Sequence, residues 1–348
     1  MSRRLPGRLL STSVHARLRN PRHSTCRNDV VRRRIEKHTT IHHALVLTAG
    51  HGTRLRPLSD VRAKPAIPVA GEPMIRRIIR WLVSQGVDDL VLNLHHRPET
   101  LTAVVGDGQD LEARVRYSWE QPQVLGSAGG PRRALPLVAA DTFLIINGDT
   151  LTDLDLGPIA AAHVESRALV TLALVPNREF DRYGGVRLDR NDCVAGFVTR
   201  GAASAGSWHF IGVQAVSASV FAELDVNVPS KSVGGVYDAL IASVPGAVRG
   251  FRCDTEFWDV GTVADYWRTS MAFMRREGQT GSSVGRAVRI DPSARINESI
   301  LWDDVEVGGG AVIEKCIVTD GVSIPAGGHY EDAVLIAAEG AAVRAISR

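Results

Sequence analysis

The sequence predicts an α/β fold followed by a short left-handed β-helix. From residue 43 onward, short apolar runs alternate with stretches of helical spacing, the pattern of a parallel sheet with right-handed helical crossovers. From Val284 to about Ala338, small and β-branched residues dominate, and apolar positions such as Ile290 and Ile296 recur six apart, as in hexapeptide β-helices. With 348 residues, 44% hydrophobic and 23% charged, the chain is long enough for two domains or for one large domain with an appendage.

Residues 1–41 are predicted to form a disordered basic arm. Residues 1–40 contain ten Arg and one Lys against two acidic residues and show no apolar periodicity. Since the whole chain carries a net charge of only +3, the remainder is acidic. We favour a solvated tail or a start site assigned too far upstream. A contact for nucleic acid or another anionic surface is the alternative, but the arm lacks interleaved aromatic residues, so nucleic acid is not an expected partner.

The first predicted strand, residues 44–47, ends in a glycine turn beside two cations. Gly50 and Gly52 let the backbone pass through positive φ and bring peptide N–H groups close to a ligand. Arg54 is a planar donor suited to phosphate oxygens, and Lys64 offers a second cation from a stiff stretch before proline. Each of these features alone is weak evidence for a phosphate-binding site, because an ordinary turn has the same composition. The G-K-[ST] sequence of a Walker loop is also missing.

The following elements alternate in type. Apolar spacing predicts a helix that starts after Pro73 and ends at Gly86, and then a strand, a short helix and a strand over 89–94, 99–105 and 113–119. In such a sheet, ligands bind beyond the carboxyl ends of the strands, where the first glycine turn lies. A second glycine-rich stretch, residues 125–130, precedes a predicted helix through Leu135, and alone it would be only a flexible turn.

Residues 142–147 are the most apolar strand after the first, so we expect a central strand there. It ends in Asn147-Gly148-Asp149. Asp149 suits an Asx turn or helix cap, but it also suits Mg²⁺, a hard cation that prefers carboxylate and phosphate oxygens. Asp153 and Asp155 are expected to cap a helix that starts near Pro158.

Shorter strands are expected over residues 168–175, 183–186, 195–199 and 209–216. Residues 256–262 then precede a helix through Met271. Within this stretch Asp259 could be a turn residue, and Thr262 could be the N-cap of the helix.

The β-helix pattern is long enough for two or three coils. An acyltransferase would need more coils and a base, and His329 is the only histidine in this segment. We therefore expect a structural module that covers the preceding α/β domain or an identical subunit, with a homo-oligomer as one outcome.

Four scattered cysteines (Cys26, Cys193, Cys253 and Cys316) form no C-x-x-C pair, which argues against a disulfide framework or a zinc site and favours a cytoplasmic protein. No apolar run approaches the ~20 residues of a membrane helix, so no membrane association is expected.

The string from Leu47 to Pro73 resembles the signature of the sugar-1-phosphate nucleotidylyltransferases (NDP-sugar pyrophosphorylases), which runs L-A-A-G-x-G-T-R-L-x-P-L-T, then P-K-P, P-V and K-P. Here Thr48 and Ala63 replace the usual Ala and Pro. Residues 125–130 match the family's L-G-T-A-G-G, and residues 258–262 match its W-x-D-x-G-T. The resemblance implies a Rossmann-like, doubly wound mixed sheet of the nucleotide-diphospho-sugar transferase type over residues 42–281, followed by the left-handed β-helix over 282–348.

The resemblance also implies the reaction: an NTP and a sugar 1-phosphate give an NDP-sugar and pyrophosphate, with Mg²⁺ as cofactor. It assigns Arg54 and Lys64 to catalysis and Asp149 and Asp259 to the metal. It assigns the nucleotide to Ala49, Gly50, Gly52, Thr53, Gly126, Ser127 and Gly148, and the sugar phosphate to Gly185, Arg200 and Gly212. One departure bears on the sugar, because Thr199-Arg200 stands where the family usually has Glu-Lys.

The closest resemblance is to the mannose-1-phosphate guanylyltransferases, which implies GTP and mannose 1-phosphate. Uridylyl- and thymidylyltransferases for glucose 1-phosphate share the same frame and remain alternatives. A non-catalytic regulatory subunit that binds nucleotide sugars is an alternative of another class, favoured by the lost Glu-Lys pair.

Overall fold

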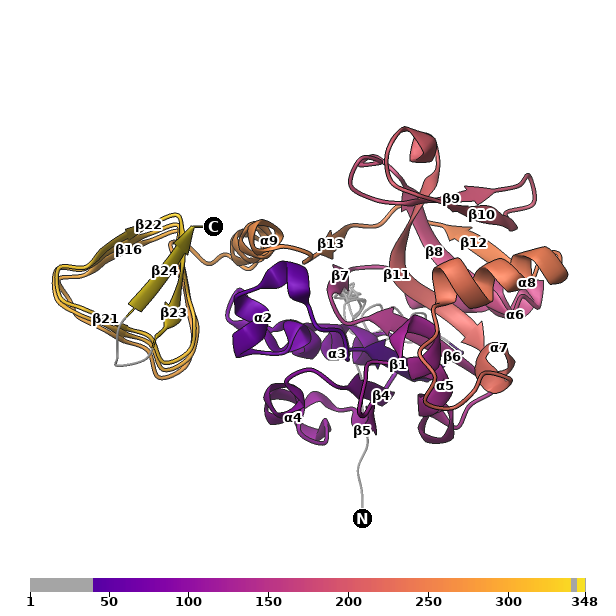
Figure 1. Cartoon of the computed structure of the whole chain (residues 1–348), viewed down its shortest axis with the longest axis horizontal. Helices are drawn as coiled ribbons and strands as arrows, with labels where there is room; N and C mark the ends of the chain where they lie inside the picture. The colour runs from indigo at the N-terminus through magenta and orange to yellow at the C-terminus, as the bar shows by residue number, and fades with distance from the viewer. Residues whose placement is uncertain (1–39, 339–342, 348) are drawn as a thin grey trace, which may run out of the picture. The chain divides into compact units, whose positions relative to one another are not determined.

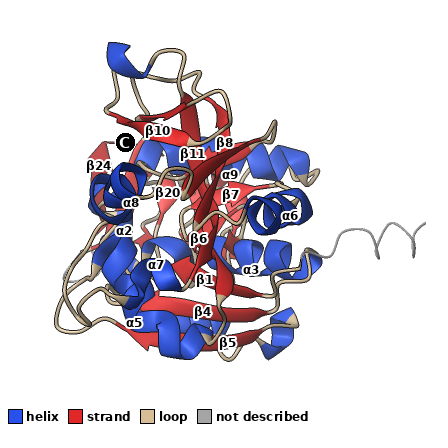
Figure 2. Cartoon of the chain, turned by 90° about the vertical axis from the view of Figure 1, so that its right-hand side faces the viewer, coloured by secondary structure: helices blue, strands red, loops and turns tan. Residues whose placement is uncertain are grey.

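The computed structural model describes residues 40–338 and 343–347, and the predicted basic arm therefore lies outside the described residues except for its last two. Its main feature is a nine-stranded mixed sheet with the order β10-β9-β11-β6-β1-β4-β5, and with β8 and β12 continuing beside β11 (Figures 1 and 2). The strands are β1 (His43–Leu47), β4 (Asp89–Leu94), β5 (Arg114–Trp119), β6 (Thr142–Asn147), β8 (Val170–Pro176), β9 (Gly185–Leu188), β10 (Val194–Val198), β11 (Trp208–Ser217) and β12 (Val248–Arg252).

The sheet is mixed, as expected from the family resemblance. Strands β6, β1, β4 and β5 are parallel, so their carboxyl ends meet at one edge. Strand β11 runs antiparallel to both β6 and β8. Strand β6 is central, as its apolar sequence predicts, because a strand that is flanked on both sides and covered on both faces favours a continuous apolar run, here residues 143–146.

Helices cover both faces of this sheet (Figure 2). Alternate residues of a strand point to opposite faces, so Leu45 and Ile145 belong to one buried cluster and Val46 and Ile146 to another. The helices are α2 (Leu58–Val61), α3 (Met74–Ser84), α4 (Pro98–Val105), α5 (Gly126–Val138), α6 (Leu156–Ser166), α7 (Ser219–Ala222), α8 (Tyr237–Ser243) and α9 (Val263–Arg276). No helix within residues 40–338 or 343–347 is long and apolar enough to cross a bilayer.

Two expectations need correction. The second glycine-rich stretch does not precede a helix but forms the first turn of α5, where a Cβ on Gly129 would lie 2.6 Å from the carbonyl oxygen of Val228. The glycine is thus required by chain packing against the helix. Asp155 caps α6 by accepting a hydrogen bond from the Gly157 amide at 3.0 Å, but Asp153 does not cap it. Asp153 accepts instead from the hydroxyl of Thr255, at 2.7 Å.

Short strands and turns complete this part of the chain. Strands β2 (Pro68–Val69) and β3 (Glu72–Pro73) form a small hairpin, and β7 (Thr150–Thr152) pairs antiparallel with β13 (Phe257–Asp259). Turns of 3-10 helix are η1 (Thr53–Leu55), η2 (Lys64–Ala66), η3 (Gln109–Leu111) and η4 (Ala202–Ser204), and η5 (Ser232–Val236) is a kinked turn before α8.

The C-terminal segment forms the expected β-helix, with three sets of stacked parallel strands (Figure 1). Each coil takes 17 residues, since Ser283 pairs with Ile300 and Ile300 with Ile317. The sets are β14 (Ser283–Val284), β17 (Ile300–Leu301), β20 (Ile317–Val318) and β23 (Ala333–Ala337); β15 (Arg289–Ile290), β18 (Glu306–Val307) and β21 (Ser323–Ile324); and β16 (Arg295–Asn297), β19 (Val312–Glu314) and β22 (His329–Glu331).

A last strand, β24 (Val343–Ser347), lies antiparallel on β23. The interior of the stack is apolar and includes Leu301, Ile313 and Val318. The domain boundary placed at 281/282 falls in the connection between α9 and β14.

Candidate functional site

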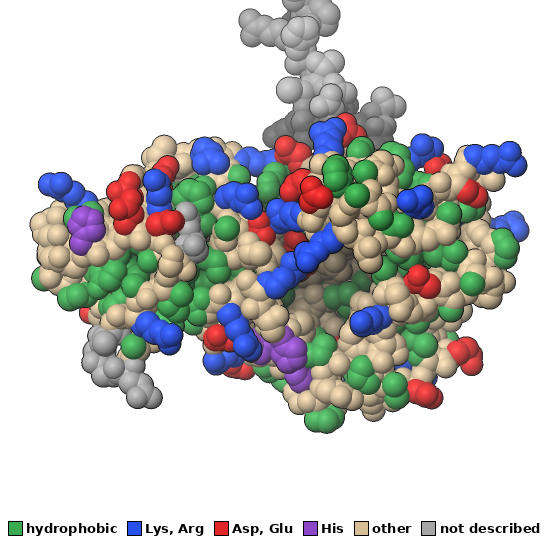
Figure 3. Space-filling view, turned by 45° about the horizontal axis from the view of Figure 1, so that its top comes forward, with side chains coloured by type: hydrophobic (Ala, Val, Ile, Leu, Met, Phe, Trp, Pro, Cys, Tyr) green, Lys and Arg blue, Asp and Glu red, His purple; other side chains and the backbone are tan. Residues whose placement is uncertain are grey.

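A cavity of about 370 Å³ opens at the carboxyl ends of β1 and β6, where the family resemblance places the nucleotide. In the space-filling view, Lys and Arg side chains border a hollow in the surface (Figure 3). The cavity is lined by Leu47, Thr48, Ala49, Gly50, Gly52, Thr53, Arg54, Lys64, Pro65, Asn93, Val124, Gly126, Ser127, Asn147, Gly148, Asp149 and Gly261. Every residue predicted for the nucleotide is in this wall, together with Arg54, Lys64 and Asp149.

The turn after β1 is shaped by its second glycine. Gly52 has a φ of 61°, a conformation that L side chains rarely adopt, and its carbonyl oxygen accepts from the Leu55 amide at 2.8 Å to start η1. A Cβ on Gly52 would lie 3.2 Å from the Cβ of both Ser59 and Lys64. The close approach of Lys64 to the turn therefore depends on the absence of a side chain.

Lys64 reaches into the cavity from η2 and forms an ion pair with Asp149. The distance between its Nζ and Asp149 Oδ2 is 2.5 Å, and Lys64 is 8% exposed. A lysine that is desolvated in this way needs an anionic partner. Asp149 is that anionic partner, and the ion pair holds the Lys64 ammonium in one place beside the glycine turn.

Backbone pairing brings the second predicted metal carboxylate beside the first. In the β7–β13 pair, Asp259 lies opposite Thr150, and the amide of Val260 donates to the carbonyl oxygen of Asp149 at 3.2 Å. A Cβ placed on Gly261, which lines the cavity, would lie 3.3 Å from both Asp259 Oδ2 and Arg54 Nη1. Arg54 and Asp149 thus line the cavity, and Asp259 lies beside its edge at Gly261.

The electrostatics of the two carboxylates fit a divalent cation. Burial and the neighbouring charge of Asp149 raise the pKa of Asp259, against the opposing effects of Lys64, Arg182 and Arg54. Two like charges that face each other are stabilised by a cation between them. Among residues 40–338 and 343–347, no group of three or more His, Cys, Asp or Glu side chains that could hold a metal ion is found.

The three residues predicted to bind the sugar phosphate do not come together as closely as the predicted nucleotide residues do. Gly212 lies at a register shift in β11, where a Cβ would be 2.5 Å from Nδ2 of Asn147 in the cavity wall. Gly185 begins β9, and a Cβ there would clash with Ser207. Arg200 lies in an exposed bend after β10 and does not line the cavity.

A buried polar chain that the sequence analysis missed joins the two nucleotide loops. Asn93 Oδ1 accepts from the Thr48 amide at 2.6 Å, and Asn93 Nδ2 donates to Glu120 Oε1 at 2.7 Å. Glu120 Oε2 accepts from the amide of Leu125 at 2.6 Å, and the side chain of Thr48 donates to the Asn93 carbonyl. The signal was present in the sequence, because Asn93 interrupts an otherwise apolar strand.

A second missed group surrounds Asp259. Arg182 Nη2 lies 3.0 Å from Asp265 Oδ2 and 3.7 Å from Asp259 Oδ2, and its guanidinium lies 4.8 Å from the ring centroid of Tyr183. Tyr183 stacks on His209 with ring centroids 4.1 Å apart. Burial lowers the pKa of His209 to about 4, so this imidazole is neutral at pH 7 and acts as an aromatic surface.

Comparison with known proteins agrees with this geometry. A family model described as nucleotidyl transferase matches residues 43–276, and one described as GlmU-like, C-terminal hexapeptide matches residues 276–330. A mannose-1-phosphate guanylyltransferase of Mycobacterium tuberculosis is 28% identical over 78% of this chain and 83% of its own length. A UTP–glucose-1-phosphate uridylyltransferase of Synechocystis is 29% identical over 81% of this chain and 76% of its own length.

The solved structure of HddC from Yersinia pseudotuberculosis shares the fold, with a TM-score of 0.58 and 22% identity, and covers 67% of this chain and 100% of its own. The match of the family model over two thirds of the sequence, at the residues that build the cavity, assigns the protein: the chain belongs to the nucleotidyl transferase family.

Proposed function

We propose that the protein transfers a nucleotidyl group from an NTP to a sugar 1-phosphate and releases pyrophosphate. One observation carries the proposal: Arg54, Lys64 and the two carboxylates Asp149 and Asp259 converge at the edge of a cavity that begins at a glycine turn. The curated relatives named above both have names of sugar-1-phosphate nucleotidylyltransferases. Proteins of the family generally use divalent metal ions, and the two facing carboxylates support Mg²⁺ here.

The reaction needs alignment and charge neutralisation rather than a protein nucleophile. The sugar phosphate is an oxyanion at neutral pH, so its oxygen attacks the α-phosphorus while the bond to the bridging oxygen breaks and pyrophosphate leaves with the electron pair. In the proposed arrangement, the amides of residues 50–53 and the Arg54 guanidinium hold the β- and γ-phosphates, and the Lys64 ammonium screens the α-phosphate. A Mg²⁺ ion bound by Asp149 and Asp259 would supply further neutralisation of the α-phosphate and sugar phosphate.

The remaining contacts determine which substrates fit. Ala49, Gly126, Ser127 and Gly148 offer a flat, small-residue wall for the base and ribose. Ser127 Oγ accepts from the Ser232 amide at 2.9 Å, which fixes its position. The absence of side chains at Gly212 and Gly185 makes room for Asn147 and Ser207. The sugar is proposed to lie beside these glycines, with Arg200 as the cation for its phosphate.

We favour GTP and mannose 1-phosphate as substrates, on the L-G-S-A-G-G stretch and the C-terminal hexapeptides, with UTP or dTTP and glucose 1-phosphate as the alternative. The test is pyrophosphate release from the four NTPs and dTTP with several sugar 1-phosphates, with and without Mg²⁺. GTP with mannose 1-phosphate should be fastest, and the rate should depend on the metal. Release that does not respond to Mg²⁺ would contradict the metal assignment, and a faster UTP or dTTP reaction would contradict the substrate pair.

One observation favours a second function, that of a non-catalytic subunit that binds nucleotide sugars. The family's Glu-Lys pair is replaced by Thr199-Arg200, and Arg200 is exposed and away from the cavity wall. The Lys64–Asp149 pair and the nearby Asp259 weigh against this function, since a protein that only binds needs no such charge arrangement. Binding of an NDP-sugar without any pyrophosphate release in the screen would decide for it.

A homo-oligomer formed through the β-helix and a cytoplasmic location are further proposals. Cys193 and Cys253 are free thiols, in keeping with a reducing compartment. Light scattering of the purified chain measures the oligomeric state directly.

A further inference from the structure

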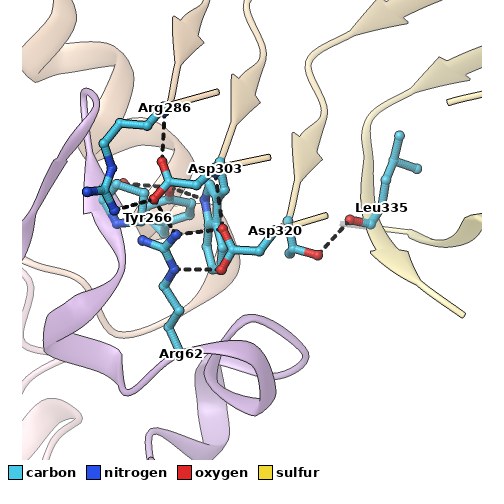
Figure 4. Close-up of polar contacts among 9 residues, drawn as sticks. Arg62, Tyr266, Arg286, Asp303, Asp320 and Leu335 are labelled. Carbon is cyan, nitrogen blue, oxygen red and sulfur yellow. Dashed lines mark hydrogen bonds and ion pairs between the residues drawn. The ribbon is translucent and has the colours of Figure 1, made fainter. Parts of the chain in front are cut away.

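The segment that carries Lys64 is held at both ends by residues from the C-terminal part of the chain. Before Lys64, the side chain of Arg62 donates hydrogen bonds to two aspartates of the β-helix, Asp303 and Asp320 (Figure 4). After Lys64, the carbonyl oxygen of Pro68 accepts from the hydroxyl of Tyr266 in α9 at 2.6 Å.

The hydrogen bonds of Arg62 with the two aspartates fix both the position and the orientation of its guanidinium group. Its Nε lies 2.7 Å from Asp320 Oδ2, and its Nη2 lies 2.6 Å from Asp320 Oδ1 and 2.8 Å from Asp303 Oδ2. Two parallel hydrogen bonds from a planar guanidinium to one carboxylate set an angle as well as a distance. The guanidinium also lies 5.3 Å from the ring centroid of Trp302, and Arg62 is 8% exposed.

The two aspartates are themselves fixed by the stacking of the coils. Asp303 and Asp320 are 17 residues apart, one coil of the β-helix, and the amide of Asp303 donates to Asp320 Oδ1 at 3.1 Å. Asp303 also accepts from the amide of Arg286 at 2.8 Å and from its side chain at 2.9 Å. Arg62 therefore docks on a rigid pair of carboxylates rather than on flexible surface side chains.

The second anchor is a buried hydrogen-bonded chain. The indole Nε1 of Trp302 donates to the hydroxyl of Tyr266 at 2.9 Å, and that hydroxyl donates to Pro68. Both aromatic rings are fully buried. A residue of the β-helix thus also restrains the far end of the Lys64 segment.

Between the anchors the backbone has little freedom. Thr100 Oγ1 accepts from the Ala63 amide at 2.9 Å, and the Lys64 carbonyl accepts from the Ile67 amide at 3.2 Å, which closes η2. The Lys64 side chain leaves this turn toward Asp149. A shift of Arg62 would therefore be transmitted to the Lys64 ammonium over two residues of constrained chain.

Given the catalytic role proposed for Lys64 above, we propose that Asp303 and Asp320 of the β-helix are positioning residues for the reaction. They act through Arg62 to set the place of the Lys64 ammonium in the cavity. In this proposal the β-helix contributes to catalysis and does not only cover the α/β domain. A displacement of about 1 Å at a reacting group can cost on the order of 100-fold in rate. Loss of the hydrogen bonds between Arg62 and the two aspartates should therefore lower kcat.

The test is the double variant Asp303→Asn, Asp320→Asn in the full chain, which keeps side-chain size and removes the charge. We expect kcat to fall roughly 10–100-fold while the KM for the sugar 1-phosphate changes little, because the disturbed group is a charge on the α-phosphate. A second readout is independent of turnover: labelling of the Lys64 amine by an acylating reagent, followed by mass spectrometry. Labelling should be faster in the variant, since Lys64 would leave its pair with Asp149 more often.

The matched control is Glu306→Gln. Arg289 and Glu306 form another ion pair 17 residues apart on the same β-helix, but their side chains are 74% and 48% exposed, and the pair includes none of Arg62, Asp303 and Asp320. This variant should keep the wild-type kcat and the wild-type labelling rate. A similar loss in the control would show a general effect of β-helix charge and overturn the proposal.

If circular dichroism shows that the double variant is unfolded, Arg62→Lys replaces it, because Lys keeps the charge but cannot form the paired contact. It should lower kcat and speed the labelling of Lys64 to a smaller extent. A folded variant with kcat and labelling within twofold of wild type overturns the proposal. Lys64→Ala distinguishes failure of the proposed function from failure of the positioning proposal. If this variant keeps full activity, the catalytic role of Lys64 is wrong. If it is inactive while the β-helix variants have normal activity, only the positioning by the β-helix is wrong.

Discussion

Single residues in the cavity are held in place by opposite charges on their neighbours. Lys64 is paired with Asp149, and Asp259 faces Asp149 with Arg182 and Arg54 nearby. Such preorganised charges need little rearrangement when substrate phosphates arrive, and this is the main source of rate in phosphoryl transfer.

Replacement of Arg54 by Ala should lower kcat by about 10²–10³, because the loss of a preorganised charge typically costs that much. Steady-state pyrophosphate release is the measurement. Arg56→Ala is the matched control, since Arg56 forms an exposed pair with Asp60 and does not line the cavity. Activity of Arg54→Ala within a few-fold of wild type would refute its role.

Asp259→Asn should make the protein more stable at pH 7 while it abolishes turnover. Burial and the Asp149 charge raise the pKa of Asp259 above its ordinary value of 3.8, so between these two pKa values the folded state holds a proton that the unfolded chain has lost. Stability therefore falls as the pH rises through this window and stays lower above it. Thermal melts at pH 7 should show a higher Tm for the variant, with a smaller increase upon Mg²⁺ addition than for wild type. A lower Tm at pH 7 would contradict this electrostatic explanation.

The residue scale also shows what the sequence could predict. Residues 49–54 are close in sequence and form one turn, so their joint placement follows from the motif. Asn93 lies in β4 and Glu120 directly follows β5, so their contact depends on the register of β4 against β5, which no local pattern specifies. The exposed position of Arg200 likewise depends on the geometry of the β10 turn.

At the scale of elements, the helix that follows the second carboxylate is started by a complete capping box. Thr262 Oγ1 accepts from the amide of Asp265 at 3.2 Å, and the Asp265 side chain accepts from the Thr262 amide at 3.0 Å. The sequence allows Thr262 as an N-cap, and the structure has it in that role. The same Asp265 carboxylate also binds Arg182, so the start of α9 is tied to the group around Asp259.

Thr262→Ala should lower the free energy of unfolding by about 1 kcal/mol, the usual cost of losing an N-cap hydrogen bond. Urea unfolding is the measurement. Thr262→Ser keeps the hydroxyl and should remain close to wild type. Equal losses for the two variants would show that the methyl group, and not the cap, stabilises this position.

Most elements could be predicted, because strands such as β1 and β6 are apolar on both faces and α3 has one apolar face. The direction of β11 could not be, since side-chain alternation is the same in a parallel and an antiparallel strand. The start of α5 was placed too late, because glycine usually ends helices. Here the glycines allow residues 228–230 to pack against the first turn.

At the scale of the whole described molecule, one unit is built from a sheet with two layers of helices and a stack of β-helix coils, and a few long-range contacts join them. Arg62 to Asp320 spans 258 residues of sequence, and Tyr266 to Trp302 joins α9 to the first coils. Hydrophobic periodicity predicts each part but contains no information about such a contact.

Trp302→Ala should lower the free energy of unfolding by about 3–5 kcal/mol, the usual cost of a large buried aromatic side chain. It removes a fully buried ring that packs against Tyr266 and lies below Arg62. Ile290→Ala, at an exposed apolar position of the same β-helix, is the control and should change stability by less than about 1 kcal/mol. Denaturant unfolding of both variants decides, and equal values would show that Trp302 does not join the two parts.

The reversed last strand has a consequence for assembly. An open coil end presents unpaired backbone groups on which a neighbouring molecule could continue the stack indefinitely, as edge strands do in fibres. Strand β24 runs antiparallel to β23 and covers that side of the terminal coil, so the next molecule meets a strand of the wrong direction there. Growth of coil upon coil is therefore interrupted on this side of the terminal coil.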